Sequence, residues 1–196
     1  MNTCVSSLQP ARASIVCVIG SLRKGSVNCI VFEAASELVG VGMSLSETPI
    51  ADVPFYNGDI EEQGDPEPVV ELKRAVRAAD GVIFFTPEYN GGLPAVVKNA
   101  LDWLSRKPGG PAIAGKPVGV IATTPGRHGA PSVRAQMATA VAAVKAKHFE
   151  NSLGVASINH ITDAGRLADP EAREALRVWL AEFHGFVVSR DVNRPG

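Results

Sequence analysis

Residues 20–28 combine small, flexible and cationic side chains directly after an apolar run, and their sequence is GSLRKGSVN. Gly20 and Gly25 permit tight backbone turns, and a helix is expected to begin within this stretch. The first N–H groups of a helix are unpaired and lie at the positive end of its dipole. The side chains that could donate hydrogen bonds here are Ser21, Arg23, Ser26 and Asn28. Together they predict a site for a phosphate monoester, which carries close to two negative charges at neutral pH.

A plainer interpretation of the same loop stays open. Ser26 could serve only as the cap of the helix, with glycines that only make the turn. Neither common nucleotide fingerprint occurs, because the loop is not GxGxxG and the chain contains no GxxxxGK[ST]. This argues against a dinucleotide-binding fold and against a P-loop nucleotidase.

A second candidate segment is TPEYNGGLP, residues 86–94. Its two prolines stiffen the loop, its two glycines let the backbone approach a ligand, and Tyr89 offers an aromatic face. Such a loop could hold a flat ring, with backbone N–H groups at the pyrimidine edge of a flavin. The alternative is a rigid connection capped by Asn90.

The elements that would position both loops alternate between two types. Three short apolar runs, 15–19, 81–85 and 118–121, fit strands that are covered on both faces of a parallel sheet. Two weaker strands are expected near 43–50 and 153–158. Helical periodicity is found at 26–39, 69–79, 94–105, 131–147 and 170–190. This alternation predicts an α/β fold, a doubly wound sandwich in which ligands bind beyond the carboxyl ends of the strands.

Composition narrows the possible partners and the location of the protein. A net charge of -1 gives no basic field for nucleic acid, and the apolar run 15–19 is too short to span a membrane. The three cysteines form no CxxC pair, which fits a reducing cytoplasm better than a disulfide framework.

We expect residues 1–12 to be a loose leader and residues 13–196 to form one domain. The longest irregular segment, 52–68, is expected to begin as an ordered loop and continue as a mobile one.

The two motifs carry a family resemblance. GSLRKGSVN and the longer PEYNGGLPAVVKNALDWLSR, residues 87–106, resemble the NADPH-dependent FMN reductase family over about residues 14–157. The resemblance implies a flavodoxin-like fold whose five-stranded parallel sheet has the order 2-1-3-4-5. It also implies FMN as cofactor and NADPH or NADH as co-substrate. Electrons would pass by ping-pong transfer to a small-molecule acceptor: a quinone, azo compound, metal oxyanion or free flavin.

The resemblance also assigns binding residues, and none of them is catalytic. The phosphate would be held by Ser21, Arg23, Ser26, Val27 and Asn28. The ring would lie along Pro87, Glu88, Tyr89, Asn90 and Gly91. A third loop, residues 123–129, would contact the ring edge through Thr124 and Gly126.

The chain departs from the family pattern on the predicted helix 131–147. Arg134, Ala135 and Gln136 are followed by Met137, where many relatives have an aromatic residue. The family resemblance favours a homodimer or homotetramer, but hydrogen bonds between subunits need not follow the family pattern. Two other functions remain open at this stage: a flavodoxin-like electron carrier and a flavin-free interaction module on the same fold.

Overall fold

The computed structural model describes residues 12–106 and 110–189. Its central element is a parallel sheet with the order β2-β1-β3-β4-β5, so the predicted topology is confirmed. The four long strands are β1 (Ala13–Ile19), β2 (Met43–Thr48), β3 (Gly81–Pro87) and β4 (Pro117–Thr123). Every residue of β3 and β4 is buried, as expected for strands covered on both faces.

The fifth strand position is divided between two short strands. The sequence predicted one strand at 153–158, whereas β5 (Lys147–His148) and β6 (Leu153–Val155) both pair in parallel with β4. The polar residues between them leave the sheet, and the carbonyl of Asn151 accepts a hydrogen bond from the indole of Trp179. This hydrogen bond attaches the segment between the two strands to α7, the last helix, which spans Pro170–Val188.

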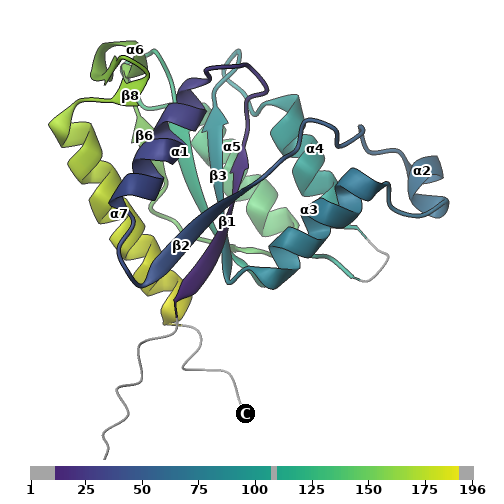
Figure 1. Ribbon diagram of the computed structural model, residues 1–196. Helices are drawn as coiled ribbons and strands as arrows, with labels where there is room; N and C mark the ends of the chain where they lie inside the picture. The colour runs from purple at the N-terminus through teal and green to yellow at the C-terminus, as the bar shows by residue number, and fades with distance from the viewer. Residues whose placement is uncertain (1–11, 107–109, 190–196) are drawn as a thin grey trace, which may run out of the picture.

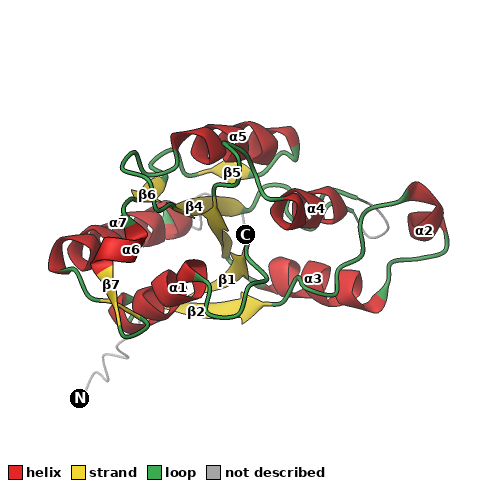
Figure 2. Ribbon diagram, turned by 90° about the horizontal axis from the view of Figure 1, so that it is seen from above, coloured by secondary structure: helices red, strands yellow, loops and turns green. Residues whose placement is uncertain are grey.

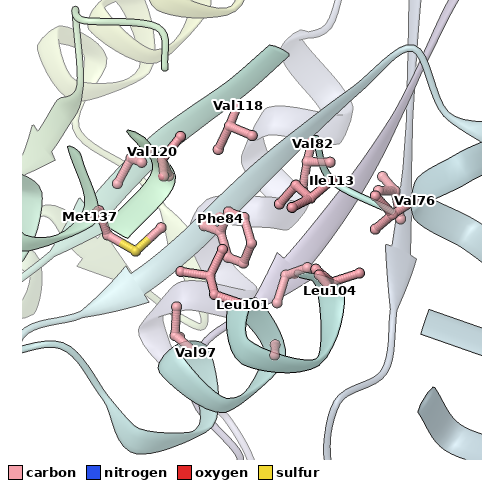
Figure 3. Close-up of a cluster of buried hydrophobic side chains, with 14 of the residues drawn as sticks. Val76, Val82, Phe84, Val97, Leu101, Leu104, Ile113, Val118, Val120 and Met137 are labelled. Atoms are coloured by element: carbon pink, nitrogen blue, oxygen red, sulfur yellow. The ribbon is translucent and has the colours of Figure 1, made fainter. Parts of the chain in front are cut away.

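Helices cover both faces of the sheet, as Figure 2 shows from above. The helices of one face are α1 (Val27–Leu38) and α7 (Pro170–Val188). Those of the other are α3 (Glu67–Ala78), α4 (Ala95–Leu104) and α5 (Pro131–Ala143). Successive side chains of a strand point to opposite faces, so Phe84 packs with α4 and α5 while Phe85 packs with α1. Figure 3 shows the first of these cores, in which Phe84 lies beside Leu101, Val120 and Met137.

Several boundaries differ from the sequence prediction. The helix expected at 131–147 ends at Ala143, because Lys145 has a φ of 59° and the chain then turns into β5. Three small features were not predicted: α2 (Gly58–Glu62), α6 (Ile158–Ile161) and the hairpin of β7 (Thr162–Asp163) with β8 (Arg166–Leu167). The hairpin turns through Ala164 and Gly165, which both have positive φ.

The irregular segment 52–68 is attached to α3 and α4. Asn99 accepts from the N–H of Tyr56 at 2.8 Å and donates to the carbonyl of Pro54 at 2.9 Å. Further along, Asp65 forms an ion pair with the buried Lys73 at 2.7 Å. The segment is therefore held near both of its ends.

The expected leader, residues 1–12, lies outside the described residues except for Arg12. The guanidinium of Arg12 donates to the carbonyl of Met43 at 3.2 Å. Among the described residues, no helix has the length and apolar character needed to cross a membrane.

Candidate functional site

Three loops leave the carboxyl ends of adjacent strands and meet at one edge of the sheet, the upper edge in Figure 1. They follow β1, β3 and β4, and we call them the first loop (20–26), the second loop (88–94) and the third loop (124–130). This edge is where ligands bind in open parallel sheets. The fold therefore brings together the three segments that the sequence singled out.

The first loop is built closely against the sheet and then turns into α1. The N–H of Gly20 donates to the carbonyl of Phe85 at 2.7 Å, and a Cβ at Gly20 would lie 2.5 Å from a methyl of Val97. Gly25 has a φ of 66°, which favours glycine. Ser26 caps α1, because its hydroxyl accepts from the N–H of Asn28 at 3.2 Å. The sequence interpretation of Ser26 as a helix cap is therefore correct.

Backbone donors remain available along this loop. The N–H groups of residues 21–25 donate no hydrogen bond to any other group in the described part of the chain. They adjoin the positive end of the α1 dipole, and the exposed Arg23 makes no ion pair with a described residue. Such a run of unpaired amides next to a cation is an anion-binding arrangement.

Two of the sequence-predicted residues lie elsewhere than at the loop surface. Val27 packs its side chain against the α1 and α7 core, so that its backbone is the part that could contact a phosphate. Asn28 is buried, and its amide oxygen accepts from the hydroxyl of Thr123 at 3.0 Å. Asn28 therefore connects the first loop to the end of β4.

The second loop is a tight hairpin. Tyr89 and Gly92 exchange two backbone hydrogen bonds, of 3.1 Å and 2.9 Å. Between them Asn90 and Gly91 have φ of 52° and 69°, the pattern of a two-residue Asn-Gly turn. The N–H groups of Asn90 and Gly91 donate to no other described residue, so they remain free to contact a ligand. Pro87 precedes the hairpin as the last residue of β3.

Tyr89 joins the first and second loops. Its hydroxyl lies 3.3 Å from that of Ser21, within hydrogen-bonding distance. The side chain is 53% exposed, so its ring is accessible from outside. The structure thus places the side chains of Ser21 and Tyr89 beside one another.

Glu88 has a different environment from the one that its place in the motif suggested. Its carboxylate accepts from the N–H of Val133, in the first turn of α5, at 3.0 Å. The side chain of Glu88 is therefore engaged by a helix.

The third loop is held by hydrogen bonds to the end of β6 and to the segment that follows it. Thr124 donates its N–H to the carbonyl of Val155 at 3.0 Å, and its hydroxyl accepts from the N–H of Gly126 at 3.1 Å. The carbonyl of Gly126 accepts from the N–H of Ser157 at 2.8 Å. Both residues that the resemblance assigned to the ring edge thus maintain the shape of the loop.

Three residues to which the sequence assigned no binding role hold the loops in place: Thr123, Arg134 and Gln136. The partners of Thr123 and Gln136 lie far away in the chain, so the sequence contains no spacing signal for these contacts. Cys17, in contrast, has the role expected of a small hydrophobe. Burial raises the pKa of its thiol far above the ordinary value, so it stays protonated.

Comparisons with known proteins agree with the family resemblance of the two motifs. The sequence model of a family described as NADPH-dependent FMN reductase matches residues 13–160. An NAD(P)H-dependent FMN reductase of Pseudomonas aeruginosa is 34% identical over 177 residues, which cover 86% of this chain and 95% of that protein. A quinone reductase of Escherichia coli is 45% identical over 109 residues, covering 55% of this chain and 57% of its own.

Among solved structures, the flavoenzyme FerB of Paracoccus denitrificans, an NAD(P)H:(acceptor) oxidoreductase, is similar over nearly its whole length. The TM-score is 0.80 at 30% identity, with 90% of this chain and 98% of FerB covered.

Proposed function

The chain belongs to the NADPH-dependent FMN reductase family, and on that premise we propose that its three loops bind FMN and that it transfers electrons from NADPH or NADH to a quinone. The observation that carries the proposal is the run of unpaired amides at residues 21–25 beside Arg23 and the start of α1.

The residues present fit the phosphate of FMN. The amides of residues 21–25 supply neutral donors, Arg23 supplies a charged one, and the dipole of α1 adds a favourable field. We call this group of donors, at residues 21–25, the phosphate cradle. Ser26 and Asn28 are buried, so they fix its shape, and Ser21 lies at its border with the second loop. The donors are therefore in place before the ligand arrives, which reduces the entropic cost of binding.

The second loop fits the flat ring. The free N–H groups of Asn90 and Gly91 are donors of the kind that the pyrimidine edge of a flavin accepts, and Pro87 stiffens the approach. The exposed ring of Tyr89 gives an aromatic surface beside them. The third loop, with Thr124 and Gly126, closes the opposite side of the same edge.

When bound, FMN would supply the redox chemistry that carries two electrons from the nicotinamide to the acceptor. The chain's own residues bind and orient, and none needs to act as a nucleophile. Backbone donors at the pyrimidine edge would favour negative charge there, as an oxyanion hole does. NADPH and the quinone would occupy the same exposed place in turn, which predicts ping-pong kinetics.

The test is to purify the protein, record its visible spectrum and measure NADPH and NADH oxidation with and without a quinone. Double-reciprocal plots of initial rate against NADPH concentration, measured at several quinone concentrations, should be parallel if the mechanism is ping-pong. Steady-state oxidation of NADPH also separates a reductase from an electron carrier that acts on protein partners. A colourless protein with no measurable affinity for added FMN would refute the proposal.

The Arg23→Ala variant tests the assignment of the loop. A charged hydrogen bond to phosphate is lost, so FMN affinity should fall about ten- to a hundredfold while riboflavin affinity stays unchanged. The control is Arg74→Ala, which removes another exposed cation, one that pairs with Glu71 on α3. Equal losses for FMN and riboflavin in Arg23→Ala would contradict the assignment.

A further inference from the structure

We propose that α5 sets the position of the second loop, and that Glu88 and Gln136 are the positioning residues through which it acts on the flavin ring. The inference rests on the proposed function, since it concerns how the FMN site is held. It assigns to Glu88 an indirect role and to Gln136 a role that its place on an exposed helix face does not suggest.

Gln136 binds the backbone of the hairpin with both ends of its amide. Its Oε1 accepts from the N–H of Leu93 at 2.9 Å, and its Nε2 donates to the carbonyl of Gly91 at 3.1 Å. Gly91 lies inside the turn and Leu93 lies just after it, so the two bonds fix the hairpin at its tip and at its exit. The turn that carries the free N–H groups is thus oriented through its next two peptides by a residue 43 to 45 positions away in sequence.

Glu88, at the start of the second loop, contacts α5 in return. The N-terminus of α5 has no side-chain cap of its own, since the cap residue is Ala130 and Pro131 opens the helix. The carboxylate of Glu88 takes that place by accepting from the N–H of Val133. A negative charge at the N-terminus of a helix is stabilised by the dipole. The second loop therefore caps α5, and α5 in turn fixes the second loop.

The same helix also holds the third loop. Arg134 donates to the carbonyl of Gly129 at 2.9 Å and to that of Ser152 at 3.2 Å. Met137, the next buried residue, anchors the helix in the core beside Val120 (Figure 3). One rigid element thus determines the spacing between the second and third loops, which are the two sides of the proposed ring site.

The positioning role of Gln136 can be distinguished from phosphate binding by comparing FMN with riboflavin, which lacks the phosphate. The hairpin retains its own Tyr89–Gly92 pair without Gln136, so the turn persists but its orientation is no longer fixed. Ring binding should weaken, whereas phosphate binding should not. FMN and riboflavin affinities should therefore fall by the same factor, unlike in Arg23→Ala.

The experiment compares Gln136→Met, which retains length and helix propensity but neither hydrogen bond, with the wild-type protein. Both FMN and riboflavin affinities should fall about three- to tenfold, because the two lost bonds are exposed to solvent. The absorption maxima of bound FMN should shift, and the melting temperature of the protein without FMN should stay close to that of the wild type. The control is Thr139→Ala, one turn along on the same exposed face of α5, which should change none of these values.

A second variant keeps the test decisive. Gln136→Glu retains the acceptor for Leu93 but places a carboxylate against the carbonyl of Gly91, so it should weaken both ligands at least as much as Gln136→Met. Combining Gln136→Met with Glu88→Ala should cost less than the product of the two single losses, because both act on one contact between loop and helix. Unchanged affinities, or a loss confined to FMN, would overturn the inference. Failure of the wild-type protein to bind any flavin would instead refute the proposed function.

Discussion

The first and third loops lie at the same edge of the sheet, yet they obtain their shapes in opposite ways. The first loop is shaped mainly by its own residues, through the bond from the N–H of Ser26 to the carbonyl of Arg23 at 3.1 Å and the Ser26 cap. The third loop is shaped by residues that follow it by about thirty positions. Val155, Ser157 and Ile158 form backbone bonds with it, and Gly154 lies against Gly129.

The shape of the first loop can therefore be predicted from its local sequence, whereas the shape of the third loop depends on how distant segments pack together. Local turns and caps are encoded within a few residues, so mutations there have moderate cost. A loop held by close backbone approach requires its partner segment at the correct distance, and mutations at that contact should cost more.

The largest effect is expected where the two backbones touch. A Cβ at Gly154 would lie 2.2 Å from the carbonyl oxygen of Gly129, so Gly154→Ala must separate the third loop from β6. We expect a loss of about 3 kcal/mol in the free energy of unfolding, measured by urea titration. Gly185→Ala on α7 is the matched control, because nothing lies within 4 Å of its added Cβ. It should stabilise the protein slightly, and a comparable loss there would contradict the argument from contact.

The next effect tests a buried hydrogen bond between the start of α1 and the end of β4. Thr123→Val removes the hydroxyl that donates to Asn28 and leaves a buried amide oxygen without that partner. The expected cost is about 2 kcal/mol in unfolding free energy. Thr48→Val is the control, since Thr48 is buried but its hydroxyl makes no hydrogen bond with another described residue. Equal costs for the two variants would mean that the Asn28 contact contributes nothing specific.

A smaller effect is expected for the local cap. Ser26→Ala removes the acceptor for the N–H of Asn28 and should destabilise the protein by about 1 kcal/mol. Ser26→Gly should cost only about 0.3 kcal/mol, because glycine is itself acceptable at this position. Chemical denaturation of both variants measures the difference. If Ser26→Ala cost as much as Gly154→Ala, the distinction between the two loops would be wrong.

The smallest effect is a pH dependence near the support of the third loop. Burial of His148 on β5 lowers the pKa of its imidazole, an effect that Glu150 partly opposes. Below the ordinary histidine pKa the unfolded chain therefore binds a proton that the folded protein does not, and stability falls as the pH is lowered through that range. Because the ring is partly exposed, the difference should stay below about 1 kcal/mol. Urea titrations at pH 7 and pH 5 should show a shallower decline for His148→Gln than for the wild type.

The sequence by itself determined the four long strands, the main helices and the capped turn of the first loop. Continuous apolar runs rich in β-branched residues favour strands that are covered on both faces. A serine that follows a glycine and precedes a helical period favours a capped turn. These signals lie within a few residues, so they do not depend on what the rest of the chain does. For the second loop the sequence predicted a stiff segment whose glycines let the backbone approach a ligand, but not the Asn90-Gly91 turn that the structure shows.

Only the tertiary structure decided where Glu88 points, what Gln136 binds, and why the strand expected at 153–158 is divided and short. Each of these depends on a contact between segments separated by about 25 to 45 positions. The contacts are Trp179 with Asn151, Gly154 with Gly129, Gln136 with Gly91, and Glu88 with Val133. A side-chain amide or carboxylate has no fixed partner in the sequence, since its hydrogen bonds are satisfied by whichever backbone groups packing brings within reach. The position of those groups is set only when α5 and α7 have packed on the sheet.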